Sequence, residues 1–182
     1  MHSTIFVLND NPISKNDVID DDYFSVSQLE RRGYDYCGVT NLEYEARDYF
    51  SGYYSEFFQT EIMKTEYEDY PEDNFVQYKM TIKNREKFMK GVYKRYRKAL
   101  KELSNALTLE KLLDSEDGDI SYLLYKLQCV MDDTCALQFY SDYGDFESPE
   151  QLMRRCKDGD VYYIVAAFDN NKRKTCGKEN EE

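Results

Sequence analysis

Short runs of β-favouring residues alternate with longer segments of helical periodicity along this chain. Residues 161–168 are almost continuously apolar and follow an Asp158-Gly159 turn, which predicts a central strand covered on both faces of a sheet. Residues 75–82 alternate well enough to predict a second strand. These two segments and three further β-favouring runs give five predicted strands. They cover residues 4–8, 34–40, 75–82, 136–140 and 161–168.

Five other segments have the apolar spacing or the capping residues of helices. Asn41 is a suitable N-cap for one helix, and Asp117 or Asp119 for another. Ser148 and Gln151 have the spacing of a capping box, with a proline at the first helical position between them. One predicted helix ends near residue 33, and a second runs from residue 42 to about 64. Three more span residues 84–107, 120–131 and 149–156.

Helices and strands of unequal length, without a regular βαβ alternation, indicate an α+β fold. We expect a small mixed β-sheet packed by several amphipathic helices. With 182 residues and 41% hydrophobic residues, the chain can build a core without disulfides or metal ions. The sequence therefore predicts one globular domain over residues 1–168 and a polar, flexible tail over residues 169–182.

The composition also indicates the cellular compartment in which the protein is expected. The chain has no basic and apolar leader at its N-terminus, and no apolar run approaches the roughly 18 residues that span a bilayer. Five cysteines are an odd number, and without CxxC spacing they fit reduced, free core thiols better than a disulfide framework. These features predict a cytoplasmic protein that does not bind membranes.

Charge is distributed unevenly over a chain whose formal net charge is -12. Residues 1–73 carry 17 acidic and five basic side chains, whereas residues 83–101 carry nine basic side chains and one acidic one. On a helical wheel, six cations of the long helix share an arc of about 100°. These six residues, which we call the basic stripe, are Lys87, Lys90, Lys94, Arg97, Lys98 and Lys101.

The opposite side of the same helix is apolar and is predicted to face the core. Its members share an arc of about 140° on the wheel. They are Phe88, Met89, Val92, Tyr93, Tyr96, Ala99, Leu100, Leu103 and Leu107.

The basic stripe fits several anionic partners. Closely spaced cations can bind the phosphate backbone of DNA or RNA, an anionic membrane or an acidic protein surface, because pairing with a polyanion releases counterions. The same stripe also fits a solvated face, or one that pairs with acidic segments of this chain or of a twin subunit. No Gly-rich or aromatic nucleic-acid signature accompanies it.

Carboxylates form several short arrays that could bind a basic partner. Arrays of this kind can imitate a nucleic-acid backbone and occupy a basic cleft in another protein, although solvated acidic loops are the alternative. The acidic stretch from Asp114 to Asp119 is a further candidate array of this kind. The candidate residues for basic-partner binding are Asp20, Asp21, Asp22, Glu66, Glu68, Asp69, Glu72 and Asp73.

Six aromatic residues crowd into ten positions of the predicted helix 42–64. One helix cannot bury all of them on a single face, so some are expected at an interface, with a wide core-facing helix as the alternative. The six residues are Tyr49, Phe50, Tyr53, Tyr54, Phe57 and Phe58.

Few residues support catalysis. The only histidine is His2, which argues against Ser-His, Cys-His and His-metal arrangements. The sequence contains no P-loop and no GxGxxG motif. We therefore expect no enzyme activity, no metal and no cofactor, while a magnesium-dependent hydrolase that uses carboxylates remains a third hypothesis.

In its size, acidity and tyrosine content, and in the segments 5–9, 34–40 and 161–168, the chain resembles the small proteins of phages and mobile elements that disarm bacterial defence. It is most similar to the anti-CRISPR proteins that inhibit Cas9. The resemblance implies a stoichiometric inhibitor, in the cytoplasm of a bacterial host cell, that binds a nucleic-acid-handling effector and blocks its DNA loading, recognition or cleavage. That family has no common fold or active site, so no site residues follow from it.

Two hypotheses from different classes result. The first is a non-enzymatic inhibitor whose acidic surface engages a basic groove of a Cas9-like effector, with the basic stripe touching guide RNA, DNA or an acidic patch. The alternative is a nucleic-acid-binding protein of a phage or plasmid that acts directly through the basic helix. The oligomeric state is left open by the sequence.

Overall fold

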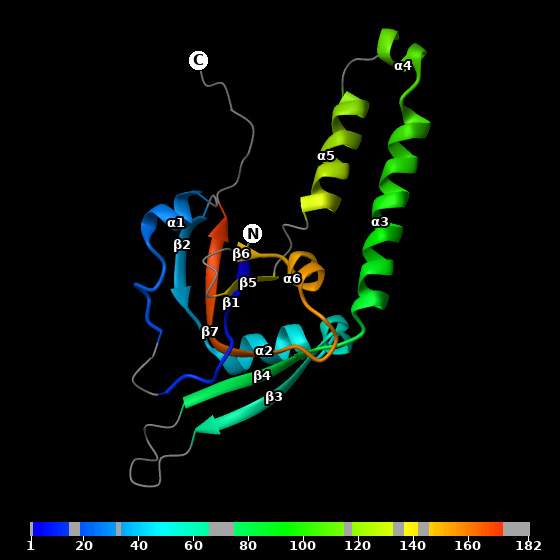
Figure 1. Cartoon of the computed structure of the whole chain (residues 1–182). Helices are drawn as coiled ribbons and strands as arrows, with labels where there is room; N and C mark the ends of the chain where they lie inside the picture. The colour runs from blue at the N-terminus through cyan, green and yellow to red at the C-terminus, as the bar shows by residue number, and fades with distance from the viewer. Residues whose placement is uncertain are drawn as a thin grey trace, which may run out of the picture.

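A twisted, seven-stranded mixed sheet with helices on both faces forms the body of the protein (Figure 1). The computed structural model describes residues 2–14, 19–31, 34–65, 75–114, 118–132, 137–141 and 146–172. The strands are β1 (His2–Asn9), β2 (Tyr34–Val39), β3 (Phe58–Thr65), β4 (Phe75–Ile82), β5 (Leu137–Ser141), β6 (Phe146–Glu147) and β7 (Val161–Lys172). The single α+β domain expected from the sequence is confirmed, and so are all five predicted strands.

Strand β7 is the centre of the sheet. The strand order is β3-β4-β7-β1-β5-β6, and β2 also pairs with β7. Strand β7 is antiparallel to β1 along one edge, while its other edge is shared by β4 near Val161 and by β2 near Lys172. Within the described strands, β1 and β5 form the one parallel pair. Among the described residues, β3 is therefore an outer strand of the sheet.

Both faces of β7 are covered, as its continuous apolar sequence predicts. Ile164 and Ala167 belong to one hydrophobic cluster, and Val165 and Phe168 belong to a second cluster on the other face. The strand continues to Lys172, so the prediction of a polar tail from residue 169 is wrong for residues 169–172, which pair with β1 and β2. Residues 173–182 of the predicted tail lie outside the described part.

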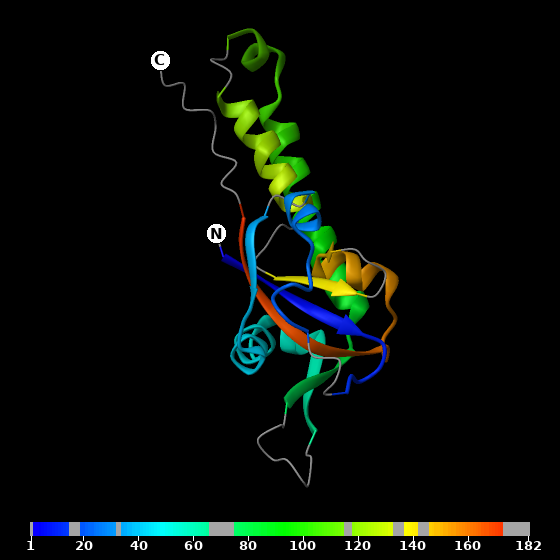
Figure 2. The same cartoon turned by 90° about the vertical axis from the view of Figure 1, so that its left-hand side faces the viewer.

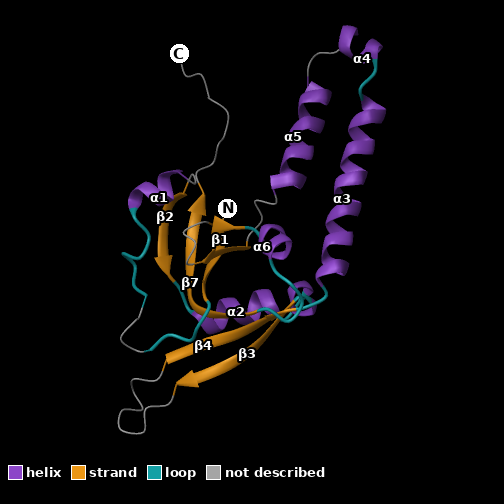
Figure 3. Cartoon of the chain, viewed as in Figure 1, coloured by secondary structure: helices purple, strands orange, loops and turns teal. Residues whose placement is uncertain are grey.

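Helices cover the two faces unequally (Figure 3). The helix α1 packs with the second cluster, whereas α2, α6 and the first half of α3 pack with the first. Their bounds are α1 (Val26–Arg31), α2 (Leu42–Phe50), α3 (Arg85–Ala106), α4 (Leu109–Asp114), α5 (Gly118–Asp132) and α6 (Pro149–Arg155), and a 3₁₀ turn, η2, spans Tyr53–Glu56. No helix in the described part of the chain is long and apolar enough to cross a membrane.

The predicted caps are partly confirmed. Asn41 Oδ1 accepts a hydrogen bond from the backbone N–H of Tyr44 at 2.9 Å, as expected of the N-cap of α2. The second residue of α5 is Asp119, so it is not the cap of that helix, and Asp117 lies outside the described residues.

The prediction of one helix from residue 42 to about 64 is wrong. Helix α2 ends at Phe50, η2 follows, and β3 begins at Phe58. Ser51 and Gly52 form the turn that ends the helix, and β3 pairs with β4 over all eight residues. The aromatic residues before Phe58 keep a helical spacing across this break, which concealed the period-two alternation of the strand. Pairing with β4 decides the outcome, because strand formation depends on context more than on local propensity.

The outer half of α3 extends beyond the sheet, and α4 and α5 return along it (Figures 1 and 2). We call residues 97–114 and 118–132 the helical arm. Phe88, Val92 and Ala99 of α3 are buried. However, Tyr93 and Leu100 are 63% and 46% exposed, so the prediction that the whole apolar side of α3 faces the core is wrong. The helix is longer than the body that it covers.

The capping box at α6 gives a direct test of the local stability. Ser148 Oγ accepts from the backbone N–H of Gln151, and the Gln151 side chain accepts from the backbone N–H of Ser148. The substitution Ser148→Ala removes one half of this exchange and should lower the free energy of unfolding by about 1 kcal/mol. Urea denaturation followed by circular dichroism would measure it. Ser104→Ala, at an exposed site inside α3, is the control and should cause no loss.

Candidate functional site

The basic stripe lies together on the exposed side of α3. All six of its residues are exposed, as the wheel predicts. Near the base of the helix, Lys87 pairs with Glu56 of η2, and Lys90 pairs with Glu86 one turn earlier at 2.7 Å. Within the described residues, Lys94, Arg97 and Lys101 have no carboxylate within ion-pair distance. The stripe therefore divides into a neutralised base and an outer part with uncompensated charge.

The same arm exposes large apolar side chains. In α4, Leu109 and Leu113 are 72% and 76% exposed, and in α5 the side chains of Tyr122, Leu124 and Tyr125 are all more than half exposed. Scattered exposed apolar residues are ordinary, whereas several large ones concentrated on one projecting element suit an interaction surface. The sequence did not reveal this group, because periodicity shows which residues share a face and not whether another layer covers that face.

An ion pair links helix α3 to helix α5. Lys126 Nζ of α5 lies 2.8 Å from Glu102 Oε2 of α3. The hydrogen bond from Lys126 lowers the pKa of Glu102, with a smaller contribution from Lys98. This pair links α5 to α3 beside the basic stripe, so the cations and the exposed apolar side chains belong to one arm.

A buried carboxylate anchors α3 to the body of the protein. The Glu150 side chain in α6 is only 2% exposed. It accepts a hydrogen bond from Arg95 and one from the Tyr96 hydroxyl at 2.7 Å, and Arg154 Nη2 lies 3.7 Å from its second oxygen. Burial, and then the hydrogen bond to Glu150, raise the pKa of Tyr96 to about 12. The phenol therefore stays a hydrogen-bond donor at neutral pH.

The start of α3 is fixed to α6 by a second set of contacts. Arg85 Nε donates to the backbone carbonyl of Met153 at 2.6 Å, and its Nη2 donates to that of Arg154 at 3.1 Å. These are carbonyls of the last turn of α6, which have no partner inside their own helix. The Arg85 backbone N–H also donates to Asp158 Oδ1 at 2.9 Å.

The three acidic candidates that the structure describes lie apart from the basic stripe. Residues 20–22 precede α1 on the side of the sheet away from α3 (Figure 1). Asp20 Oδ1 accepts from the backbone N–H of Asp22 at 3.2 Å, and Asp21 Oδ1 accepts from that of Val39 at 2.7 Å. Two of these three carboxylates therefore also order the chain locally. The remaining acidic candidates, Glu66, Glu68, Asp69, Glu72 and Asp73, and the acidic residues at 115–117 lie outside the described residues.

The six clustered aromatic residues are divided among three elements. Phe50, Phe57 and Phe58 are buried, Tyr49 and Tyr54 are partly buried, and Tyr53 is exposed. Phe57 packs edge-on against Phe88 of α3, with ring centroids 5.1 Å apart. Because the chain turns through η2, the six aromatic side chains do not have to share one helical face. Most of them are therefore part of the core.

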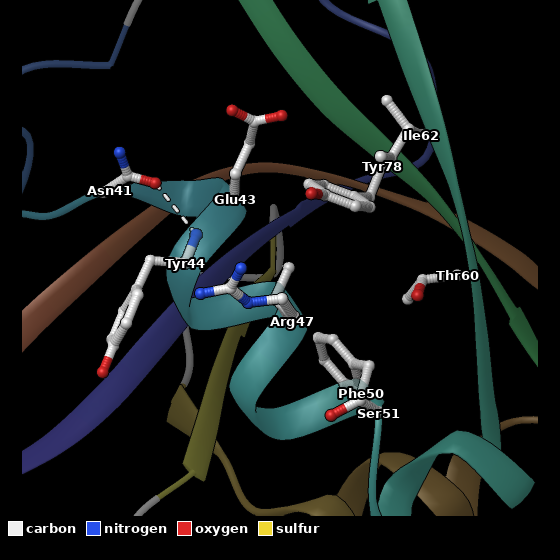
Figure 4. Close-up of a pocket in the computed structure, with 10 residues that line it drawn as sticks. Asn41, Glu43, Tyr44, Arg47, Phe50, Ser51, Thr60, Ile62 and Tyr78 are labelled. Atoms are coloured by element: carbon white, nitrogen blue, oxygen red, sulfur yellow. Dashed lines mark hydrogen bonds between the residues drawn. The ribbon is translucent and has the colours of Figure 1, made fainter.

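A groove opens between α2 and the β3–β4 hairpin (Figure 4). Its volume is about 550 Å³, and Phe50, Ala46, Ile62 and Tyr78 supply its apolar surface. Glu43 and Arg47 of α2 stand on the side opposite Thr60. Sequence reasoning missed this groove because it placed residues 51–64 in a helix.

The described residues contain no group of three or more histidine, cysteine or acidic side chains arranged to hold a metal ion. Comparisons of the chain with protein-family models, with curated proteins and with solved structures gave no match.

The predicted free core thiols are confirmed for two of the three described cysteines. Cys37 and Cys156 are buried and free, whereas Cys129 is free but exposed on α5. Burial, followed by the nearby carboxylates of Asp169 and Asp21, raises the pKa of Cys37 to about 12. Burial also raises the pKa of Cys156. Cys135 and Cys176 lie outside the described residues.

These environments predict a clear order of thiol reactivity. Because the thiolate is the reactive form, Cys37 and Cys156 should resist Ellman's reagent in the native protein. In a variant carrying Cys135→Ser and Cys176→Ser, one thiol should react rapidly at neutral pH, and two more only after unfolding. Adding Cys129→Ser should abolish the rapid phase, and rapid labelling that persists in that variant would contradict the burial of the core thiols.

Removing the charge of Glu150 should loosen the attachment of the arm. The substitution Glu150→Gln weakens the charge-assisted bonds to Arg95 and Tyr96 and should cost about 1–3 kcal/mol in urea unfolding. Amide hydrogen exchange in the outer half of α3 should accelerate as well. Glu102→Gln breaks an exposed ion pair of the same helix and is the matched control, for which little change is expected.

Proposed function

We propose that this protein is a stoichiometric, non-enzymatic binding protein that inhibits a nucleic-acid-handling effector of a bacterial host, in the manner of an anti-CRISPR protein. The observation that carries the proposal is the helical arm. It presents uncompensated cations, such as Arg97 and Lys101, beside exposed leucine and tyrosine side chains. This combination supports an interaction surface rather than a solvated helix.

Interfaces of specific complexes place apolar and aromatic anchors at their centre and charges around them. The arm has both components on one projecting element, so it could enter a cleft that a flat surface could not reach. Its cations would meet guide RNA, DNA or an acidic patch of the effector. Apolar side chains such as Leu113 and Tyr122 would supply contacts that salt does not screen.

The acidic residues support a second contact. The segment that holds Asp20, Asp21 and Asp22 leads into α1, which lies on the side of the sheet away from α3 (Figure 1), so acidic and basic side chains are separated. An effector that binds nucleic acid has both a basic groove and, when loaded, exposed phosphates. A protein with separated acidic and basic surfaces complements both parts.

The first experiment titrates the protein into a purified Cas9-type effector with its guide RNA and measures DNA cleavage. Cleavage should fall to its minimum near one equivalent of protein. Complex formation should weaken steeply as salt rises, since several charges pair. Lys94→Glu with Lys101→Glu should weaken inhibition by at least about tenfold, because like charges then face the phosphates or an acidic patch.

The matched control is Lys83→Glu with Lys157→Glu, which changes the net charge equally at exposed positions outside the stripe. Inhibition should be nearly unchanged in this variant. Equal loss in both variants would show that only the net charge matters. A pull-down from nuclease-treated bacterial lysate, across a salt series, extends the test to other effectors, and failure to retain any nucleic-acid-processing protein would reject the proposal.

A second candidate is direct binding of DNA or RNA through the basic stripe, favoured by the absence of described ion-pair partners for Lys94, Arg97 and Lys101. It predicts retention on DNA or RNA columns at low salt. Substituting Lys90, Lys94, Arg97 and Lys101 by Glu should abolish that retention. Recovery of nucleic acid without any protein in the pull-down would favour this candidate over inhibition.

A further inference from the structure

The groove between α2 and the β3–β4 hairpin has a built polar lining (Figure 4). Arg47 and Glu43 lie one helical turn apart on α2 and both line the groove. An acidic and a basic residue at this spacing commonly pair with each other. Here, within the described residues, neither side chain has an ion-pair partner. Arg47 instead lies over the Tyr44 ring, 5.8 Å from its centroid.

Tyr78 adds a hydrogen-bond donor to the lining of the groove. The residue is only 7% exposed, and its hydroxyl points from β4 into the groove toward Glu43 and Arg47 (Figure 4). Among the groove residues drawn in Figure 4, none makes a hydrogen bond to this hydroxyl. Burial, and then the nearby Glu43 carboxylate, raise the pKa of Tyr78, so the hydroxyl remains a donor. The hydroxyl oxygen itself reaches the open groove, where water or a ligand can accept its hydrogen bond.

The apolar part of the lining limits the ligand further. Phe50 and Ala46 are buried in the wall of α2, and Ile62 of β3 is 54% exposed at the mouth. Ser51 and Thr60 add hydroxyl groups near Phe50. The groove thus offers one cation, one anion and several hydroxyls around an apolar surface, in a volume that suits a small molecule.

We propose that this groove binds a small zwitterion with an apolar body, of the α-amino-acid class. The Arg47 guanidinium binds the ligand carboxylate, and the Tyr78 hydroxyl donates to that carboxylate. The Glu43 carboxylate binds the ammonium group, and the apolar side chain of the ligand lies against Phe50 and Ile62. A ligand of single charge would leave Glu43 or Arg47 unmatched, because it would attract one of them and repel the other.

This site is independent of the arm and of the proposed inhibition, since none of its lining residues belongs to the basic stripe or to α5. The test uses the full chain and four probes: L-leucine, L-phenylalanine, N-acetyl-leucine and leucinamide. Binding is followed by amide chemical shifts in ¹⁵N-labelled protein. Leucine or phenylalanine should bind saturably and shift the signals of Ser51 and Thr60. N-acetyl-leucine lacks the ammonium group and leucinamide the carboxylate, so each should bind at least about tenfold more weakly.

Variants separate the roles of the two charges. Arg47→Gln and Glu43→Gln should each weaken leucine binding by about tenfold or more, and Tyr78→Phe by a smaller factor. Asp48→Asn, on α2 but outside the lining, is the control and should bind like the original protein. The proposal is overturned if neither amino acid binds saturably at ~10 mM. It is also overturned if a singly charged probe binds as tightly as leucine, or if both charge substitutions leave binding unchanged.

Discussion

The burial of one carboxylate, Glu150, decides where α3 leaves the body of the protein. A buried charge is tolerated only when its partners are well placed, because removal from water costs several kcal/mol. Two of those partners, Arg95 and Tyr96, come from α3, and Arg154 comes from α6. Shifting or rotating α3 would break these contacts together. The direction of the whole arm therefore follows from one short network at its base.

That network is continuous with the rest of the core through η2. Asn84 Nδ2 donates to the Glu56 carbonyl at 2.9 Å, and Phe57 packs against Phe88. Residues of η2 thus hold the start of α3 on one side and join α2 to β3 on the other. The groove and the arm are built on opposite sides of the same turn, although they share no lining residue. The turn η2, which the sequence did not predict, therefore connects the part of the chain that lines the groove with the helix that carries the arm.

The sequence predicted elements wherever the local signal and the tertiary context agree. Strand β7 has an apolar run that can only be buried on both sides, and α6 has a capping box whose two hydrogen bonds form within four residues. It failed at β3, where helical spacing of aromatics competes with a strand whose partner, β4, lies ten or more residues away. The exposed face of the arm could not be predicted either, because amphipathic periodicity is identical whether the covering layer exists or not.

The charged and the apolar side chains of the helical arm would act at different stages of binding. Charges act over roughly a Debye length of 10 Å, so Arg97 and Lys101 would attract an anionic partner before contact. Apolar side chains act only on contact, so Leu113 and Tyr122 would determine how long a complex lasts. Charge-pair contributions at the edge of an interface fall mainly on the association rate. A partner that satisfies only the cations would therefore bind fast and leave fast, whereas one that also covers the leucines and tyrosines would remain bound.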